Sequence, residues 1–368
     1  MKIVLTGGGT GGHVYPAISI AQALKKLSGS DAELLYIGSS HGPEGDIARN
    51  AGLEFISIPS GPISKTLSLR NARSLAMLFA GIFRARKVLK EFAPDVVVGT
   101  GGYVTAAILM AQRSLGGPIV IHEQNVRPGR TNTLLAKIAD KICVSFEDSV
   151  DYMPKEKTEV TGLPIRAQFI DMSSKADARR ELGLNEDLFT IVAVGGSQGA
   201  RKPNEIIAGA WPIIDDGATQ LLHQVGERYI NEMRNLLGPP EERSHYAVEA
   251  YIDVPLAFAG ADLVISRSGG TVAEITAAGR PSILFPYPYH KDQHQKRNAE
   301  YLVERGAAVM CEDLSTTSEQ LADIISRLRS SPQQLASMAS ASAALGKPDA
   351  AERIAQIVLQ VTKTHVGN

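Results

Sequence analysis

Short apolar runs alternate with longer stretches of helical spacing along nearly the whole chain. KIVLT, AELLYIG, DVVVG, PIVIHE and KICVSF are apolar over the length of a strand, which is typical of strands buried on both faces of a sheet. Between them, stretches such as PAISIAQALKKL place apolar residues three and four positions apart, as on one face of a helix. This alternation predicts βαβ units and a parallel, doubly wound sheet.

The alternation of strand and helix patterns is interrupted at VTGLPIRAQF, which contains Gly162 and Pro164, and resumes after it. IVLTGGGTGGHVYPAISIA and IVAVGGSQGARKPNEIIAGA repeat one unit of strand, glycine turn and helix. Further strands are predicted at TQLLHQVG, YAVEAYI, DLVISR, PSILFPYP and AAVMCE. We therefore predict two α/β domains, residues 1–163 and 164–346. Ligands of such sheets bind beyond the carboxyl ends of the strands, which predicts a crevice between the domains.

The composition of the chain argues against several classes of function. The 368 residues carry a net charge of -1, with 44% hydrophobic and 21% charged residues, as in an ordinary globular protein. No basic excess points to nucleic acid, so no nucleic-acid partner is expected. The longest apolar stretch is about half of a membrane span and no signal peptide is expected, so the protein should not cross a bilayer. Cys143 and Cys311 lie far apart without metal-ligand spacing, which fits the cytosol, and no metal is expected.

The first glycine turn, TGGGTGGHVYP, matches the dinucleotide-binding pattern through Gly7, Gly9 and Gly12. That pattern also needs an acid at the end of the second strand, whereas this strand ends in Gly38-Ser39-Ser40. No G-K-[ST] follows the loop either. A nicotinamide or flavin cofactor is therefore disfavoured, and a purely structural turn remains an alternative. A histidine at the start of the helix is unusual for a mere turn.

Other polar loops follow predicted strands. GTGGYVTAA is another glycine turn, and IHEQNVRPGRTN carries many polar groups away from a buried strand, which favours a site. In SRSGGTVAEI, Glu274 could accept both hydroxyls of a ribose, although a solvated helix glutamate is the alternative. Near HKDQHQKRNA, His290 and His294 lack a third zinc ligand, so the amides and carboxylates there suit sugar hydroxyls better. No D-x-D occurs, so a diphosphate would rely on helix N-termini and arginine.

GGGTGGHVYPA, GTGGYVTA, HEQN, GGSQGAR, SRSGGTVAEI and HKDQHQKRNA occur in this order over nearly the whole chain. Together they resemble the bacterial undecaprenyldiphospho-muramoylpentapeptide β-N-acetylglucosaminyltransferase family. The resemblance implies the GT-B architecture: two Rossmann-like domains facing a cleft, with the last helix, about 347–368, packing back on the first domain. It also implies that GlcNAc passes from UDP-GlcNAc to the C4 hydroxyl of MurNAc in lipid I, making lipid II with inversion and without a cofactor. GLPIR departs from the family pattern, because Leu163 stands where many relatives have asparagine.

Carried over by position, the resemblance implies roles for particular residues. Glu274 would hold the ribose, Thr271 the diphosphate and Gln295 the GlcNAc hydroxyls, while Ile252 would face uracil through its backbone. His13 matches the proposed base or acceptor-site histidine. The implied donor-binding set is Thr10, Gly11, Gly12, Asn125, Arg166, Ser197, Ile252, Thr271, Glu274 and Gln295.

A lipid acceptor implies contact with a membrane, and residues 61–92 are the candidate surface. Apolar residues lie between basic ends there, which suits an interface with anionic headgroups. The alternative is a core helix with solvated ends. The basic residues are Lys65, Arg70, Arg73, Arg84, Arg86, Lys87 and Lys90, and the apolar ones are Leu75, Leu78, Phe79, Ile82 and Phe83. We expect a peripheral protein at the cytoplasmic face of the bacterial inner membrane.

Three rival functions stay open. A UDP-GlcNAc 2-epimerase shares the architecture and the donor, but it would not need the basic, apolar segment 61–92. A nucleotide-sugar-binding regulator without catalysis is disfavoured by His13. An NAD-dependent dehydrogenase lacks its ribose-binding acid.

Overall fold

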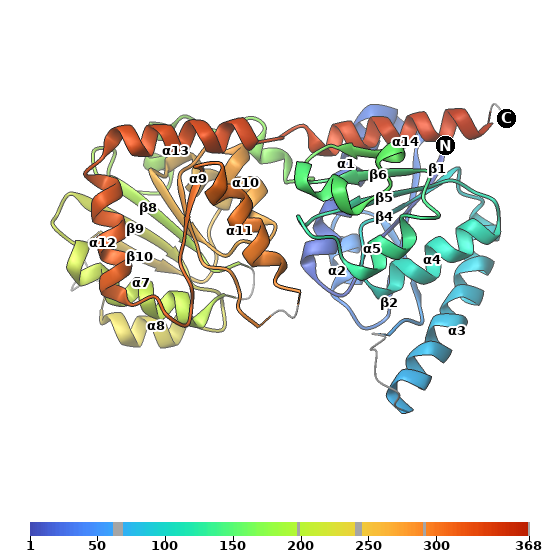
Figure 1. Ribbon diagram of the computed structural model, residues 1–368, viewed down its shortest axis with the longest axis horizontal. Coiled ribbons are helices and arrows are strands. Elements are labelled where there is room, and N and C mark those ends of the chain that lie inside the picture. Colours follow the sequence, from blue (N-terminus) through green and yellow to red (C-terminus); the bar gives the residue numbers. More distant parts are fainter. Residues whose placement is uncertain (62–68, 197–198, 240–244, 290–291, 367–368) are drawn as a thin grey trace. The chain divides into compact units, whose positions relative to one another are not determined.

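The computed structural model describes residues 1–61, 69–196, 199–239, 245–289 and 292–366. The chain divides into two compact units, Met1–Arg166 with Pro348–Asn368, and Ala167–Lys347. Each contains one parallel sheet covered by helices on both faces (Figure 1). The predicted fold class, two Rossmann-like doubly wound domains, is confirmed.

The first unit contains a seven-stranded sheet in the order β3-β2-β1-β4-β5-β6-β7. All its strand pairs are parallel; for example, Val4 pairs with Leu35 on one side and Val97 on the other. The strand order reverses between β1 and β4, so this is where ligands of doubly wound sheets bind. The strands are β1 (Lys2–Thr6), β2 (Glu33–Ser39), β3 (Glu54–Ile58), β4 (Val96–Gly99), β5 (Ile119–Glu123), β6 (Lys141–Val144) and β7 (Thr158–Val160).

Two apolar layers cover the faces of this sheet. One layer comes from α1, α2 and α14; Ile354 and Val358 of α14 are fully buried in the same cluster as Ile20 and Leu24 of α1. The other layer comes from α3, α4 and α5. The helices are α1 (Gly11–Ser28), α2 (Glu44–Asn50), α3 (Leu69–Phe92), α4 (Tyr103–Ser114), α5 (Arg130–Leu135) and α14 (Ala350–Val366).

The second unit repeats the plan with six parallel strands in the order β10-β9-β8-β11-β12-β13. Its switch point lies between β8 and β11. The strands are β8 (Phe189–Val194), β9 (Thr219–Gln224), β10 (Tyr246–Glu249), β11 (Leu263–Ser266), β12 (Ser282–Leu284) and β13 (Ala308–Met310). The helices are α6 (Lys175–Glu181), α7 (Arg201–Ile214), α8 (Ile230–Leu237), α9 (Val254–Gly260), α10 (Thr271–Ala277), α11 (His294–Glu304), α12 (Ser318–Arg329) and α13 (Pro332–Leu345).

The structure contains every strand predicted from an apolar run and adds β3 and β7. These two form the edges of the first sheet, and both are partly exposed. An edge strand covered on fewer sides needs no continuous apolar run, which is why the hydrophobic pattern missed them. In the part of the chain that the structure describes, no helix combines the length and apolar character needed to cross a membrane.

Candidate active site

Two glycine turns meet at the switch point of the first unit. Gly7–Thr10 follows β1, Thr100–Gly102 follows β4, and Gly8 N donates to Gly101 O at 3.1 Å. A side chain on Gly102 would overlap the carbonyl of Gly8, and Gly102 has a φ of +92°, so only glycine fits. Residues 10–13 are therefore held at the carboxyl end of the sheet.

His13 lies in the first turn of α1 and faces back over the glycine turn. Its Nδ1 lies 3.2 Å from Gly8 O and 3.2 Å from Thr10 Oγ1. The Thr100 hydroxyl donates to the carbonyl of His13 at 2.7 Å. Since a carbonyl oxygen only accepts, the contact with Gly8 places the proton on Nδ1 and leaves Nε2 as the acceptor nitrogen. A Cβ at position 101 would lie 2.8 Å from Cδ2 and 3.2 Å from Nε2 of His13, so the glycine there leaves room for the imidazole.

The loop after β5 is organised by one buried carboxylate. Glu123, 1% exposed, accepts hydrogen bonds from Asn125 N at 2.9 Å and Asn125 Nδ2 at 3.1 Å, and from Gly129 N at 3.0 Å and Asn132 Nδ2 at 2.9 Å. Burial raises the pKa of Glu123, while these hydrogen bonds lower it. Because Asn125 Nδ2 donates to Glu123, the amide of Asn125 is held in one orientation.

His122, next to Glu123, is buried and connects neighbouring segments of the first unit through hydrogen bonds. Its Nε2 donates to Gly162 O at 3.0 Å, and its Nδ1 accepts from Gln124 Nε2 at 3.3 Å. Full burial lowers the pKa of His122 to about 4, so the ring is neutral at pH 7. Gln124 also donates to Thr100 O at 2.5 Å, which ties this loop to the turn after β4.

In the second unit, the turn after β11 is held by hydroxyl and amide groups. Ser268 Oγ donates to the carbonyl of Gln295 at 2.8 Å, and Asn298 Nδ2 donates to Ser268 O at 3.2 Å. Thr271 begins α10, and Glu274 lies in its first turn. The Gln295 Oε1 atom accepts from Tyr287 N at 2.9 Å, so this carbonyl is engaged and the amide nitrogen faces Gly269.

A nearly buried ion pair lies beside this turn. Arg267 Nη1 donates to Asp313 Oδ1 at 2.6 Å and to Phe285 O at 3.1 Å, and the guanidinium lies 5.5 Å from the Tyr287 ring centroid. Burial raises the pKa of Asp313, whereas Arg267 lowers it. Sequence reasoning missed Asp313, since a single acid after a strand has no distinguishing pattern.

The remaining predicted residues belong to other segments or lie outside the described part. Arg166 is the last residue of the first unit and is partly buried. Ile252 follows β10, which β9 and β8 separate from β11. Ser197, His290 and Lys65 lie outside the described residues, so their predicted roles stay predictions. Among the described residues, no three His, Cys, Asp or Glu side chains are grouped to hold a metal.

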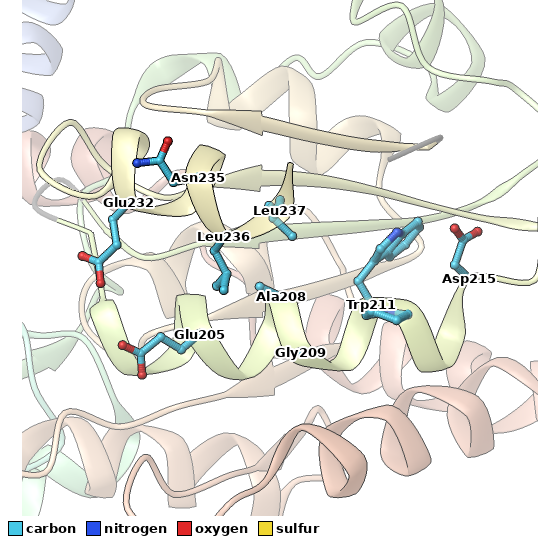
Figure 2. A pocket seen from close by; sticks show the side chains of 10 residues that line it. Glu205, Ala208, Gly209, Trp211, Asp215, Glu232, Asn235, Leu236 and Leu237 are labelled. Carbon is cyan, nitrogen blue, oxygen red and sulfur yellow. The ribbon is translucent and has the colours of Figure 1, made fainter. Parts of the chain in front are cut away.

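A broad groove, with a volume of about 910 Å³, lies elsewhere in the second unit, between α7 and α8 (Figure 2). Trp211, Leu236 and Leu237 line it together with three acids, Glu205, Asp215 and Glu232. Arg201 pairs with Glu232 at 2.8 Å and with Glu205 at 3.2 Å. None of the predicted site residues that the structure describes lines this groove.

Comparisons with known proteins place both units in one family. Residues 3–144 match the glycosyltransferase family 28 N-terminal domain, and residues 190–354 match its C-terminal domain. The chain is 38% identical to the UDP-N-acetylglucosamine--N-acetylmuramyl-(pentapeptide) pyrophosphoryl-undecaprenol N-acetylglucosamine transferase of Desulforamulus reducens, over 98% of this chain and 99% of the relative.

Two solved structures bear on the fold. The crystal structure of Acinetobacter baumannii MurG is similar with a TM-score of 0.78 and 26% identity, covering 98% of this chain and 99% of that one. The UDP-GlcNAc 2-epimerase of Neisseria meningitidis, solved with UDP-GlcNAc, has a TM-score of 0.69 and 14% identity, covering 98% of this chain and 100% of that one. At that identity, the likeness to the epimerase concerns the fold alone.

Proposed function

The chain belongs to glycosyltransferase family 28, and from that premise we propose how its residues perform the transfer for which its relatives are named. The protein is an N-acetylglucosamine transferase of peptidoglycan synthesis. It moves GlcNAc from UDP-GlcNAc to N-acetylmuramyl-(pentapeptide) pyrophosphoryl-undecaprenol, converting lipid I to lipid II. The observation that carries this function is the 38% identity over 98% of the chain to a relative of that name.

Donor binding is assigned to residues of both units. In the second unit, Glu274 accepts hydrogen bonds from the ribose hydroxyls, Thr271 contacts the diphosphate, and Ser197 and the backbone of Ile252 contact the nucleotide. Gln295 reaches the GlcNAc hydroxyls, and its amide nitrogen is the group to do so because its carbonyl is engaged by Tyr287 N. In the first unit, the donor contacts are Thr10, Gly11, Gly12, Asn125 and Arg166.

His13 acts as the general base at Nε2. The acceptor C4 hydroxyl gives its proton to this nitrogen while its oxygen attacks the anomeric carbon of GlcNAc. The bond from that carbon to the UDP oxygen breaks on the opposite face, so the configuration inverts. The hydrogen bond from Nδ1 to Gly8 O keeps the proton away from Nε2 and orients the ring.

The departing UDP carries the charge that develops in this step. Arg166 and the backbone N–H groups of the glycine turns are the groups that stabilise it, because preorganised donors are most effective where charge develops. The second turn suits this role, since its polar anchors are neutral amide and hydroxyl groups.

The acceptor's lipid requires a membrane surface, and α3 is the element proposed to meet it. Leu75, Phe79 and Phe83 are spaced four residues apart along α3 and are 47%, 55% and 73% exposed. Arg73, Arg84, Arg86, Lys87 and Lys90 accompany them on the same helix. An exposed apolar row among basic side chains suits peripheral binding to the anionic cytoplasmic face of the inner membrane.

The proposed contact of this apolar row with a membrane can be tested with phospholipid vesicles. Phe79→Ser with Phe83→Ser should reduce sedimentation with anionic phospholipid vesicles about tenfold, since two aromatic anchors are lost. Leu134→Ser is the control, because this residue of α5 is 69% exposed, between the values of Phe79 and Phe83. Equal losses in both proteins would remove α3 as the membrane contact.

One assay tests the function itself. The protein is incubated with labelled UDP-GlcNAc, with and without a lipid I analogue. Label should reach the lipid only when the acceptor is present. Appearance of UDP-ManNAc without acceptor would instead establish the epimerase.

A further inference from the structure

Glu44, the first residue of α2, is an acid buried against the first glycine turn. It is 0% exposed. Its Oε1 accepts from Ser39 N at 2.9 Å, and its Oε2 accepts from Gly9 N at 3.4 Å. Burying a carboxylate is costly unless hydrogen bonds compensate it, so these contacts are essential to its position.

The surroundings of Glu44 are shaped to admit its carboxylate. A Cβ on Gly8 would lie 2.6 Å from Oε1, and one on Gly42 would overlap Oε2. Tyr36, in β2, donates its hydroxyl to Gly7 O at 2.7 Å, and burial together with the charge of Glu44 raises the pKa of this hydroxyl. The hydroxyl therefore stays protonated and keeps donating to the turn.

Gly8 connects Glu44 to His13. One side of Gly8 faces the Glu44 carboxylate, and its carbonyl lies 3.2 Å from His13 Nδ1. Any shift of the turn toward the space that Glu44 fills would therefore change the orientation of the imidazole.

We propose that Glu44 is a positioning residue whose carboxylate fixes the Gly7–Thr10 turn and thereby aims His13 at the acceptor hydroxyl. It holds the Gly9 N–H group as a bound phosphate would hold it in a Rossmann turn. The Gly9 N–H group thus already has an internal anion as its partner, and this part of the turn orients the base. This inference rests on the proposed role of His13.

The test is Glu44→Gln in the full-length chain, compared with Asp46→Asn. The amide can still accept at one atom, but its NH₂ group then faces either Gly9 N–H or Ser39 N–H and the turn loosens. We expect kcat for acceptor-dependent transfer to fall about 100-fold, as misplacement of a reacting group by about 1 Å can cause. The KM for UDP-GlcNAc should change by less than kcat, because Thr10, Gly11 and Gly12 are only part of the proposed donor contacts and the ribose and diphosphate contacts lie in the second unit. Asp46 lies on the same helix, with an 85% exposed side chain paired to Arg49, so its variant should retain wild-type kcat.

Hydrogen exchange separates positioning from a general loss of structure. Backbone amides of residues 7–13 should exchange at least tenfold faster in Glu44→Gln than in Asp46→Asn, while the strands of the second unit are unchanged. Glu44→Asp, which keeps the charge on a shorter side chain, should have an intermediate kcat.

Three outcomes would overturn the inference: an unchanged kcat in Glu44→Gln, unchanged exchange at residues 7–13, or loss of UDP binding in both Glu44 variants. The last outcome would make the carboxylate a requirement for folding. A wild-type kcat in His13→Ala would instead overturn the proposed base, and the exchange experiment would still report on Glu44.

Discussion

The two switch points share one backbone plan and differ in how a buried acid is used. In the first unit, Glu44 accepts directly from the glycine turn, and His13 follows that turn. In the second unit, the buried acid Asp313 is paired with Arg267, and the turn is held by Ser268 and Asn298. The first arrangement is proposed to orient a proton acceptor, whereas the described anchors of the second turn are neutral hydroxyl and amide groups.

This difference shows why the glycine pattern alone does not identify a function. The match at Gly7, Gly9 and Gly12 describes a strand-to-helix turn that many sites share. The side chains packed behind the turn decide whether its N–H groups hold an internal carboxylate or meet a ligand. We therefore expect substitutions of His13 and Glu44 at the first turn to change kcat more than donor affinity, and substitutions at the second turn to change donor affinity more than kcat.

The largest expected effect is that of His13→Ala. Loss of the base should lower kcat about 1,000-fold, within the range of general base catalysis, while the affinity for UDP changes little. Steady-state transfer to a lipid I analogue and calorimetry with UDP measure the two quantities. His41→Ala is the matched control, since this histidine is exposed on the same unit. A kcat reduced less than tenfold would assign the base to another group.

The sequence predicted most of the fold because buried parallel strands have a continuous apolar pattern. It failed at β3 and β7, whose partly exposed residues lack that pattern. Candidate residues next to glycine turns, such as His13 and Thr271, could be named from the sequence because motifs include them, and their roles stay predictions. Glu44 and Asp313 were not found, since burial of a single acid depends on tertiary packing that no local spacing encodes.

The prediction for the second turn is a loss of donor affinity in Glu274→Ala. If Glu274 holds both ribose hydroxyls, its removal should weaken UDP-GlcNAc binding about 30-fold. This factor corresponds to a loss of roughly 2 kcal/mol, which is typical of hydrogen bonds to a charged group. Calorimetry measures this, and kcat at saturating donor should change less than in His13→Ala. Glu304→Ala, an exposed acid on α11 of the same unit, is the control. Unchanged affinity would remove Glu274 from the donor site.

The smallest expected effect is the pH dependence of stability that one buried histidine gives to each of the two sheets. Burial lowers the pKa of His122 in β5 to about 4 and that of His223 in β9 to about 3. An unfolded histidine titrates near pH 6.5, so below this pH the unfolded chain binds a proton that the folded chain does not. The free energy of unfolding should therefore fall as the pH falls, by about 1 kcal/mol per histidine between pH 7.5 and 5.5.

His122→Gln should remove this pH dependence from the first unit only, and His223→Gln from the second only. Urea unfolding followed by hydrogen exchange in the strands of each unit, at pH 7.5 and 5.5, measures the two separately. If both variants keep the wild-type slope, other groups govern acid sensitivity. If each variant changes the pH dependence of stability in its own unit only, the two sheets lose stability independently as the pH falls. The sheet beneath each turn then has its own sensitivity to acid.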